Sequence, residues 1–594
     1  MRDTFRAFAT TIGFGFRAAP WHAAFQIVTE IALGLVGPFT GYSMKLLLDA
    51  VQAKDLDLAL VGGTVLSVTI AVLLVAMYYN AHCIFTVIER TQALADRKLM
   101  TLIGGIDSLA HHERPEYLDQ IYRLREERES LAEMTNASAG FVAALVSFAA
   151  TSVLLAQVHP ALLSLALVAG ISMWISSKAN DIRVEAQEET SEPERLRRHM
   201  YDIGTTAGAG KELRIFGLTK EIVRRHHETS DLVLSARNEA DWRAARLKSI
   251  DALINAAAFV GAIALVLMLA LSGRATIGDV GLVVTLAVEM GMVVAGTVGY
   301  GGDFLWTLKQ ARRFIWLEQY AKSAVKATAD PMPAPKRLGH GIDLDAVTFH
   351  YPGTERPILE NVSAHLPAGA VVALVGENGA GKTTLVKLLC DFYQPDGGQI
   401  LVDGEDLARI PTRQWHQRVS TAFQDYAQFE FQARETVGVA VTAKIDDDGA
   451  LNGALARADA TSIVEALPQG LDSQLGTTWS EGVDLSGGQW QKLALARGLL
   501  REDPLLVVFD EPTAALDPQT EHALFERFAA AARAGHDQGT VTLLVSHRFS
   551  TVRMADLIIV LENGRIREIG DHQQLIDRGD LYAELYELQS RAYR

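Results

Sequence analysis

Four stretches of the sequence carry no charged side chain and are each long enough to cross a lipid bilayer. They are Leu58–Met77, Ala137–Val158, Pro160–Ser177 and Ala252–Ser272. A helix of about 20 apolar residues spans a hydrocarbon core of roughly 30 Å. The whole chain agrees with this pattern, because 49% of its 594 residues are hydrophobic and 21% are charged. This composition disfavours an ordinary soluble protein and excludes intrinsic disorder, so we expect a membrane protein.

Two further apolar stretches are interrupted by polar residues. One is Trp21–Leu48, which contains Glu30, and the other is Ile277–Trp306, which contains Glu289. Both can span a bilayer if their polar groups face protein or water, so we predict six spanning helices. A charged side chain at the bilayer centre costs about 3 kcal/mol or more. Two interpretations of the glutamates therefore stay open: they line a polar cavity, or they are protonated or hydrogen-bonded packing residues.

The polar segments between the spans are unevenly distributed. Glu89–Met134 and Lys178–Lys248 are long and rich in Arg and Glu at helical spacing, whereas the connections on the other side are short. The bias of basic loops toward the cytoplasm places the long segments there, and an even number of spans returns the C-terminal half to the same side. Met1–Pro20 interleaves arginines with phenylalanines, which predicts an amphipathic helix on the membrane surface in preference to a secretory signal.

The second half of the chain has a different character. From about Gly341 onward, short apolar strands alternate with amphipathic helices, and Pro331–Pro335 before them favours an extended connection. We therefore predict four segments, listed here by residue number: an N-terminal helix at 1–20, a transmembrane domain at 21–325, a linker at 326–340 and a nucleotide-binding domain at 341–594.

Charge and cysteine content exclude two further classes. The chain has 55 Lys plus Arg and 71 Asp plus Glu, a formal net charge of −16, so we expect no nucleic-acid partner. Its two cysteines, Cys83 and Cys390, exclude a disulfide framework.

The strongest motif is a phosphate-binding loop. It follows the apolar run Val371–Val375 and precedes the helical run Leu385–Leu389, which is the context such a loop requires. Its glycines let backbone N–H groups converge on phosphate oxygens, Lys382 should reach the β- and γ-phosphates, and the Thr383 hydroxyl should bind Mg²⁺. The loop residues are Gly376, Glu377, Asn378, Gly379, Ala380, Gly381, Lys382 and Thr383, followed by Thr384.

A second acidic motif is consistent with the same chemistry. The apolar run Leu506–Phe509 ends in Asp510 and Glu511. Beside a phosphate loop, Asp510 can hold magnesium and Glu511 can polarise or deprotonate the attacking water. The two motifs together indicate an ATPase or GTPase.

A third motif precedes a further predicted helix, Trp490–Leu500. Ser486 is suited to cap that helix, and Gly487, Gly488 and Gln489 expose backbone N–H groups to a second phosphate-binding helix start. With this motif, the segment from about Ile342 to Leu588 resembles the nucleotide-binding domain of ATP-binding cassette (ABC) transporters. The membrane half resembles the six-helix half of ABC exporters in pattern and loop length. The resemblance implies a membrane α-helical bundle of six helices joined to an α/β P-loop NTPase domain.

The resemblance extends to single residues. Tyr351 resembles the aromatic residue that stacks on adenine, and Gln424 resembles the glutamine that touches magnesium and the attacking water. His547 resembles the switch histidine that contacts the γ-phosphate, and Ala515–Asp517 resembles the loop that crosses to the partner subunit. One departure is Ala514, where the family commonly has Ser.

The family's mode of action implies the cofactors and the partner. It implies ATP and Mg²⁺, with catalysis by Glu511, His547 and Lys382, and it builds each ATP site from two subunits. Because the loop, Glu511 and the Ser486 motif are all intact, two copies of this chain could form two competent sites. A homodimer is favoured, and a heterodimer with a second half-transporter stays open.

Finer features suggest a cargo. The stretches Phe423–Tyr426, Phe429–Phe431, Arg434–Thr436 and Trp479–Asp484 look similar to bacterial exporters of lantibiotics and related modified peptides. We therefore expect export of an amphipathic substrate, a peptide, out of the cytoplasm. The alternatives are a multidrug or lipid exporter or flippase of the same fold, and after these an exporter-fold importer.

Two short segments complete the expectation. His111–Gln120 and Ala207–Gly217 resemble the coupling helices with which the membrane half of such transporters docks into the ATPase domains. The alternative is that both are ordinary loop turns.

Overall fold

The computed structural model describes residues 12–126, 128–206, 208–325, 330–511, 539–546 and 548–592. The chain divides into two units. Unit 1 comprises Met1–Leu102 and Gln120–Gln319, and unit 2 comprises Ile103–Asp119 and Tyr320–Arg594. The segment 103–119, which sequence alone assigns to the transmembrane domain, thus groups with the nucleotide-binding half.

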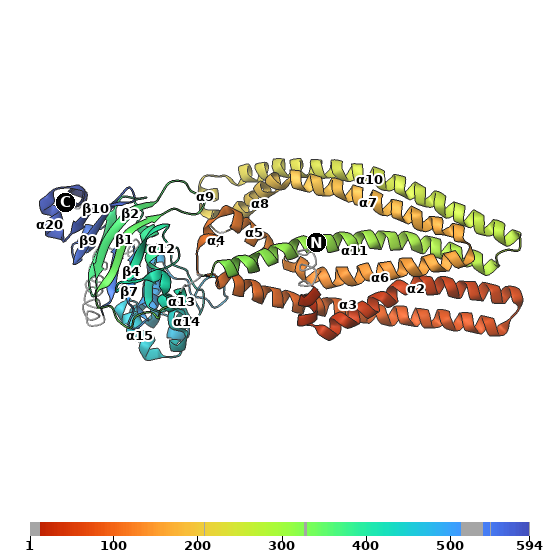
Figure 1. Ribbon diagram of the computed structural model, residues 1–594, viewed down its shortest axis with the longest axis horizontal. Coiled ribbons are helices and arrows are strands. Elements are labelled where there is room, and N and C mark those ends of the chain that lie inside the picture. Colours follow the sequence, from red (N-terminus) through yellow and green to blue (C-terminus); the bar gives the residue numbers. More distant parts are fainter. Residues whose placement is uncertain are drawn as a thin grey trace. The chain divides into compact units, whose positions relative to one another are not determined.

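Unit 1 is built from long helices (Figure 1). Among the described residues, six helices are long and apolar enough to cross a membrane, which confirms the predicted number of spans. Their bounds are α2 (Pro20–Ala53), α3 (Leu56–Gly104), α6 (Arg128–Val158), α7 (Ser164–Glu189, preceded by the 3₁₀ turn η1, Pro160–Leu163), α10 (Thr219–Leu271) and α11 (Ile277–Ser323). Shorter helices are α5 (Pro115–Glu126), α8 (Ser191–Thr205) and α9 (Gly210–Ile215).

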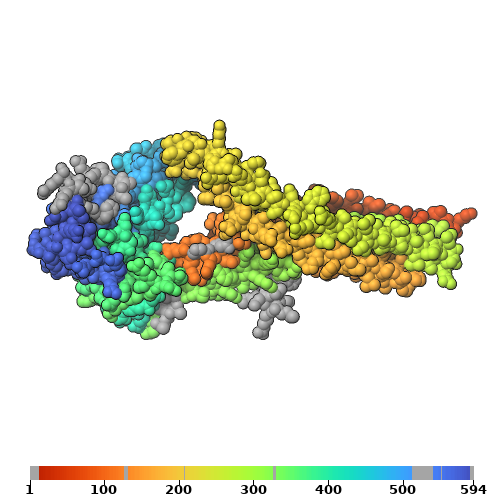
Figure 2. All heavy atoms as spheres, turned by 90° about the horizontal axis from the view of Figure 1, so that it is seen from above, coloured from red at the N-terminus to blue at the C-terminus, as the bar shows by residue number. Residues whose placement is uncertain are grey.

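The helices of unit 1 pack in pairs far apart in sequence. Helix α2 packs along α6, and α7 packs along α10. Figure 2 shows α7 and α10 as adjacent amber and yellow-green ridges. Within α3 and α10, only 11% of the most apolar 18-residue window is buried in the chain. These two helices therefore leave a broad apolar surface for lipid or for another chain.

Polar contacts join the C-terminal part of α2 to the start of α11. The Lys45 ammonium lies 2.6 Å from the Asp279 carboxylate, and the Gly278 N–H donates to Asp49 Oδ1 over 2.9 Å. A Cβ at Gly278 would lie 2.4 Å from the carbonyl oxygen of Lys45, so the close approach requires glycine there.

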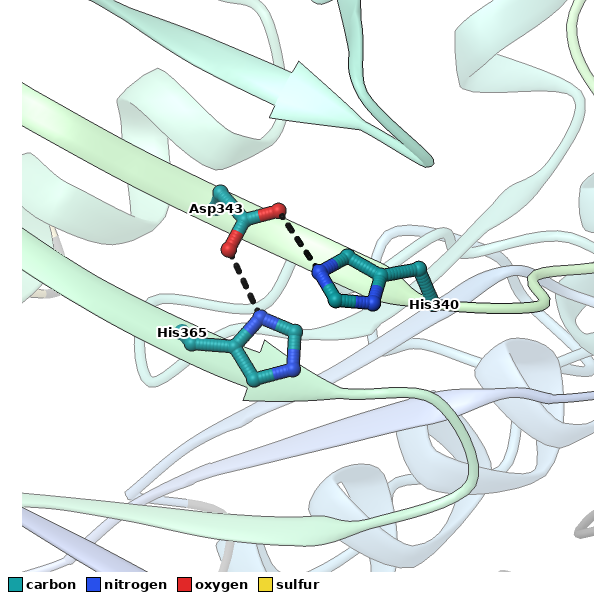
Figure 3. Close-up of side chains that lie close together, drawn as sticks. All are labelled: His340, Asp343 and His365. Carbon is teal, nitrogen blue, oxygen red and sulfur yellow. Dashed lines mark hydrogen bonds and ion pairs between the residues drawn. The ribbon is translucent and has the colours of Figure 1, made fainter.

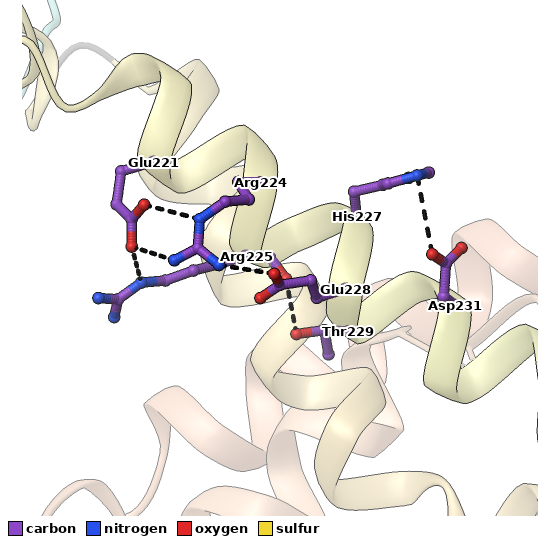
Figure 4. Close-up of polar contacts among 7 residues, drawn as sticks. All are labelled: Glu221, Arg224, Arg225, His227, Glu228, Thr229 and Asp231. Carbon is purple, nitrogen blue, oxygen red and sulfur yellow. Dashed lines mark hydrogen bonds and ion pairs between the residues drawn. The ribbon is translucent and has the colours of Figure 1, made fainter.

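The polar end of α10 is a continuous helix stabilised by side-chain pairs one turn apart (Figure 4). Glu221 accepts hydrogen bonds from Arg224 and Arg225, and Arg224 also donates to Glu228 over 2.6 Å. The hydrogen bonds from Arg224 and Arg225 lower the pKa of Glu221 to about 2. Such pairs add to the stability of a helix. Helix α10 begins at Thr219, so Lys178–Lys248 contains helix that extends past the span, as its helical spacing of Arg and Glu indicates.

Residues 12–18 form a helix, and the rest of the N-terminal helix predicted at 1–20 up to residue 11 lies outside the described residues. Phe14 is buried and meets Phe314 of α11 edge to face at 5.1 Å, and the Lys98 ammonium lies 4.4 Å from the Phe14 ring centroid. These described residues therefore pack onto the bundle through at least one aromatic side chain.

Unit 2 contains two sheets. The antiparallel sheet has the order β2 (Leu359–Pro367), β1 (Gly341–Phe349), β4 (Gly397–Val402), β5 (Glu405–Asp406). The larger sheet has the order β10 (Arg565–Gly570), β9 (Leu557–Glu562), β3 (Val371–Gly376), β8 (Val541–Val545), β7 (Leu506–Asp510), β6 (Val419–Ala422). Neighbouring strands from β9 to β6 are parallel, and β10 is antiparallel to β9.

Helices cover the larger sheet. Those described in unit 2 are α4 (Ala110–Glu113), α12 (Lys382–Leu389), α13 (Thr412–His416), α14 (Ala433–Gly438), α15 (Asp448–Arg457), α16 (Thr461–Glu465), α17 (Gly487–Leu499), α19 (Phe549–Val552), α20 (His572–Arg578) and α21 (Leu581–Ala592), with 3₁₀ turns η2 (Leu407–Arg409), η3 (Val439–Lys444) and η4 (Gly470–Asp472). Strand β3 is buried on both faces: Val371 and Ala373 enter one apolar cluster, and Val372 and Leu374 enter the other. This double burial explains the uninterrupted apolar run before the phosphate loop.

Both cysteines are buried and free, as the sequence predicts.

Candidate nucleotide site

The loop Gly376–Thr383 connects the end of β3 to the start of α12, which confirms the predicted strand–loop–helix order. Gly379 and Gly381 adopt left-handed backbone angles, with φ of 84° and 103°. A Cβ at Gly381 would lie 2.7 Å from Leu359 Cδ2, so this position also lacks room for a side chain. Asn378, Gly379 and Thr383 are exposed, which leaves the loop open to a ligand.

Lys382 is held inside this loop. Its ammonium group donates to the carbonyl oxygens of Gly376 and Glu377 over 2.8 and 3.0 Å. Burial lowers the pKa of Lys382, and the carboxylates of Glu511 and Asp510 oppose that shift. The loop thus presents a cation next to an acidic pair, which suits a phosphate group bound with a metal ion.

The acidic pair lies where the predicted strand ends. Asp510 closes β7 and is buried, and the Glu511 N–H donates to the carbonyl oxygen of Val545 on β8 over 3.0 Å. Glu511 has a left-handed φ of 46°, uncommon for a residue with a side chain. Burial, together with the neighbouring Glu511 and Asp425 carboxylates, raises the pKa of Asp510 to about 6. A bound cation would stabilise the charged form of a buried carboxylate whose pKa is raised in this way.

The donor set around this edge fits magnesium. Thr383 offers a hydroxyl, Gln424 an amide oxygen and Asp510 a carboxylate, and Mg²⁺ prefers such hard oxygen ligands. Gln424 lies in the turn after β6, the strand that pairs in parallel with β7. Because parallel strands end at one edge of a sheet, the motif residues after β3, β6 and β7 lie at the same edge.

Ser486 caps α17, as predicted. The Gln489 N–H donates to Ser486 Oγ over 3.3 Å, and the Ser486 N–H donates to Gln489 Oε1 over 2.8 Å, which forms a capping box. Ser486 and Gly487 are exposed, and Gly488 and Gln489 are half-buried, so the first backbone groups of the helix face outward.

The turn after β6 is connected to this helix start. The Tyr426 hydroxyl donates to the carbonyl oxygen of Gly487 over 2.8 Å. Gln424 lies two residues from Tyr426, so one hydrogen bond connects the turn that contains Gln424 to the Ser486 motif. The sequence indicates Tyr426 only through the resemblance to peptide exporters, because a contact with a residue 61 positions away leaves no local pattern.

Arg497 is a second anchor that sequence analysis missed. From α17 it donates to the carbonyl oxygens of Thr436 over 2.8 Å and of Ala427 over 3.2 Å, and its guanidinium lies 4.5 Å from the Phe429 ring centroid. Burial lowers its pKa to about 10. An arginine within the apolar helix Trp490–Leu500 was the signal that could have identified it.

Tyr351 lies beside the helix that follows the phosphate loop. Its hydroxyl is 3.2 Å from Thr384 Oγ1, and the Lys387 ammonium lies 5.3 Å from the centre of its ring. The structure thus brings Tyr351 and Thr384 together, while adenine stacking stays a prediction. His547, Ala514 and Ala515–Asp517 lie outside the described residues.

The first predicted coupling segment contacts the nucleotide-binding half directly. Leu109 and Ala110 pack against its apolar cluster, and His111 is buried. The Lys387 ammonium donates to Glu113 Oε1 over 2.6 Å, and the Tyr393 hydroxyl donates to Glu113 Oε2. Burial and the Glu113 carboxylate raise the pKa of Tyr393. These contacts favour docking over an ordinary loop turn for this segment.

The second predicted coupling segment belongs to unit 1. It contains α9, and Ile215 and Phe216 at its end are 79% and 66% exposed. Ala207 lies outside the described residues. Docking of this segment stays a prediction.

The structure distinguishes the two glutamates of the spans. Glu30 is buried, and its Oε1 accepts a hydrogen bond over 2.7 Å from Asn80, which in turn accepts one from Thr29 over 2.8 Å. This network supports the packing interpretation for Glu30. Glu289 is half-buried beside Gly37, where a Cβ would lie 2.2 Å from its carboxyl carbon.

Comparisons with known proteins agree with this geometry. Residues 359–514 match the family model described as ABC transporter. A protein named ATP-dependent lipid A-core flippase from Dechloromonas aromatica is 38% identical over 45% of this chain and 44% of its own length. A protein of the same name from Ralstonia nicotianae is 40% identical over 47% and 46%. ABC transporter B family member 1 of Arabidopsis thaliana is 38% identical over 46% of this chain and 22% of its own length. The match thus covers less than half the length of each of these three relatives.

A solved structure matches far more of the chain. It is that of a bacterial Atm1-family ABC exporter with ATP bound, with a TM-score of 0.76 over 96% of this chain and 98% of that chain. The sequences are 22% identical, so this likeness shows the fold. The chain is therefore a multi-span membrane protein with the fold of an ABC exporter half, six apolar helices joined to a nucleotide-binding domain that contains the ABC transporter family match at residues 359–514.

Proposed function

We propose that this chain is an ATP-driven exporter that moves an amphipathic molecule of the lipid class away from the cytoplasmic leaflet of the membrane. The observation that carries the proposal is the nucleotide site: Lys382 is held inside the phosphate loop, next to Asp510 and Glu511, in a chain that also has six helices of membrane length. A phosphate site on a multi-span chain is explained by ATP hydrolysis coupled to transport.

Each residue of the site has a task in this proposal. The backbone N–H groups of Gly376–Thr383 and the Lys382 ammonium bind the phosphates of ATP. Thr383, Gln424 and Asp510 would hold Mg²⁺, which neutralises phosphate charge when bound. Glu511 takes a proton from the attacking water, and its backbone bond to Val545 fixes the carboxylate at the strand end. His547 is assigned to the γ-phosphate by resemblance, and Tyr351 to adenine.

Two copies of the chain form the working assembly in this proposal. The exposed start of α17 at Ser486 offers N–H groups to the phosphates bound by a partner's loop. Because Glu511 and Ser486 are both present, one kind of chain supplies both parts of each site. A homodimer is therefore the simplest assembly, and a heterodimer is the alternative.

The cargo proposal differs from the peptide expected from sequence. The two bacterial relatives described above are named lipid A-core flippases, and neither name mentions a peptide. The matches cover less than half of each relative, so the shared name supports a lipid-class cargo and leaves its headgroup open. The peptide resemblance rested on stretches within residues 423–436 and on residues 479–484, which belong to unit 2 and to none of the six apolar helices.

The test uses the full chain reconstituted in liposomes. We would measure ATP turnover and ATP-dependent movement of fluorescent glycolipids, a cationic amphipathic peptide and a cationic drug. A glycolipid that raises turnover and changes leaflet only with ATP supports the proposal. Glu511→Gln is the matched control, because it keeps the fold and removes the base.

Two results would overturn it. Stimulation and translocation of the peptide alone would restore the peptide interpretation. ATP turnover with no movement of any lipid, peptide or drug would instead indicate a sensor or gated channel.

A further inference from the structure

Two histidines and one aspartate converge at the start of the antiparallel sheet of unit 2 (Figure 3). They are His340, just before β1, Asp343 on β1 and His365 on β2. His365 Nδ1 lies 2.7 Å from Asp343 Oδ1, and His340 Nε2 lies 3.6 Å from Asp343 Oδ2. One donor atom from each residue lies within 4.8 Å of the other two.

The backbone holds this cluster in place. Asp343 and His365 are directly paired residues of the β1–β2 ladder, so their side chains emerge together on one face. The Asp403 carboxylate accepts hydrogen bonds from the N–H groups of His340 and Gly341 over 2.8 and 2.9 Å. The Ala368 N–H donates to the carbonyl oxygen of His340 over 3.0 Å. All three residues are therefore positioned by strand pairing and backbone hydrogen bonds before any ligand binds.

We propose that His340, Asp343 and His365 form a binding site for a divalent transition-metal ion of the zinc class, separate from the nucleotide site. Two imidazoles and a carboxylate suit Zn²⁺, Co²⁺ or Ni²⁺, whereas Mg²⁺ and Ca²⁺ prefer all-oxygen sites. Metal–ligand bonds of about 2.0–2.2 Å require donor atoms about 3–3.5 Å apart. His340 is 67% exposed and can rotate by the small amount needed, and the Asp343 carboxylate supplies the negative charge.

The site lies where the linker enters the nucleotide-binding half. Upstream, Asp330 pairs with Arg409 over 2.7 Å, and the Met332 N–H donates to the carbonyl oxygen of Arg409 over 2.9 Å. A metal bound by His340 and His365 would add a side-chain link between β2 and the other end of the linker, which Asp403 and Ala368 already hold by backbone hydrogen bonds. It would thereby strengthen the attachment of residues 330–340 to unit 2 and stabilise that unit by mass action.

The chain offers a matched control in the same sheet. His350 Nδ1 lies 3.1 Å from Asp396 Oδ2, which is a histidine–aspartate pair without a second histidine near it among the described residues. If the cluster is only two separate histidine–aspartate contacts, His340 and His350 should behave alike toward metal.

The experiment titrates Co²⁺ and then Zn²⁺ into the full chain in detergent, without a polyhistidine tag or nucleotide. Excess Mg²⁺ occupies hard-cation sites, including the acidic edge of the nucleotide site. We would measure bound metal per chain, the visible absorption of Co²⁺ and the thermal unfolding midpoint. The variants are His340→Ala, His365→Ala and Asp343→Asn, with His350→Ala as the control.

The expected result is one bound metal ion per chain that raises the unfolding midpoint of the wild type. Each cluster variant should bind it at least about 10-fold more weakly, lose the midpoint increase and keep the metal-free midpoint. His350→Ala should bind as the wild type does. Equal affinity in wild type, His340→Ala and His365→Ala would overturn the proposal. So would an equal loss in His350→Ala. If Asp343→Asn does not fold, the metal affinity of His340→Ala decides the test, because His340 is exposed and its replacement should not disturb the fold.

Discussion

The ammonium group of Lys387 donates a hydrogen bond of 2.6 Å to the carboxylate of Glu113, a residue 274 positions earlier in the chain. Lys387 lies on α12, the helix that begins at the phosphate loop, and its ammonium is also 3.3 Å from the Tyr351 hydroxyl. Tyr351 in turn contacts Thr384. A chain of polar contacts therefore joins the docked segment 103–119 to the predicted nucleotide contacts.

Breaking the Glu113–Lys387 pair should uncouple transport from ATP turnover. In Glu113→Gln, the half-buried Lys387 loses its anion, which weakens docking by about 1–3 kcal/mol. We expect basal ATP turnover within about twofold of wild type and a several-fold lower number of cargo molecules moved per ATP. Both quantities are measured in the reconstituted system.

The control for that experiment is Glu116→Gln. Glu116 lies on the same segment, its side chain is 78% exposed, and its ion pair with Arg114 is 3.6 Å long. Surface pairs of this kind contribute little, so its coupling ratio should equal that of the wild type. Equal impairment of both variants would contradict a specific role for Glu113.

Removing the proposed base should separate ATP binding from hydrolysis. Glu511→Gln keeps the side-chain volume and the backbone bond to Val545 but cannot accept the proton of water. We expect ATP affinity within about threefold of wild type and turnover at least about 100-fold lower. Nucleotide binding is followed by fluorescence and turnover by phosphate release.

Glu502→Gln is the comparison variant for this loss. Glu502 is nearby in sequence, its side chain is 72% exposed, and it pairs only with Lys444 among the described contacts. Its turnover should be unchanged. Near-normal turnover in Glu511→Gln would remove Glu511 from the role of base.

Two substitutions at Ser486 should distinguish capping from phosphate binding. Ser486→Ala removes the cap of α17 and should lower stability by about 1 kcal/mol. Ser486→Asp keeps the cap but places a carboxylate where a partner's phosphates are expected. We expect a near-normal unfolding midpoint and at least about 10-fold slower ATP turnover for Ser486→Asp. Normal turnover in that variant would show that Ser486 does not face nucleotide.

Buried His111 should make the docked segment sensitive to acid. Burial and the neighbouring His112 lower the pKa of His111 to about 4. The unfolded chain binds a proton below about pH 6.5, while the folded chain resists it. The stabilisation is therefore complete above pH 6.5 and is lost as the pH falls toward 4. At about pH 5 the loss is roughly 2 kcal/mol, because each pKa unit corresponds to about 1.4 kcal/mol.

The measurement compares unfolding midpoints at about pH 7.5 and pH 5. In His111→Leu, the decrease between these conditions should be smaller than in the wild type by several degrees. His112→Gln is the comparison variant: it removes the smaller cause of the lowered pKa and leaves the burial of His111 unchanged, so its decrease should lie closer to that of the wild type. Titrating groups other than these two histidines are common to all three proteins. An equal decrease in His111→Leu and wild type would contradict the prediction.

The sequence by itself determined the features that depend on neighbouring residues. The four uncharged runs and the two apolar runs that contain a glutamate predicted six spans, because spanning a bilayer depends on length and polarity. The loop at Gly376–Thr383 and the cap at Ser486 were found at the right element boundaries, because strand ends and helix starts impose local residue types. The helical spacing of Arg and Glu in Glu89–Met134 and Lys178–Lys248 is likewise a local feature, and it indicated helices in these polar segments.

Contacts between distant segments were decided by the tertiary structure alone. Glu113 meets Lys387, Tyr426 meets Gly487 and Glu30 meets Asn80 only because sheet order and helix packing bring these positions together. The type of a single residue does not reveal its distant partner. From sequence alone, an Arg or Glu on a helix is expected to be a solvated side chain. The proposed metal site depends in the same way on the β1–β2 register, since a shift of one residue would turn Asp343 and His365 to opposite faces.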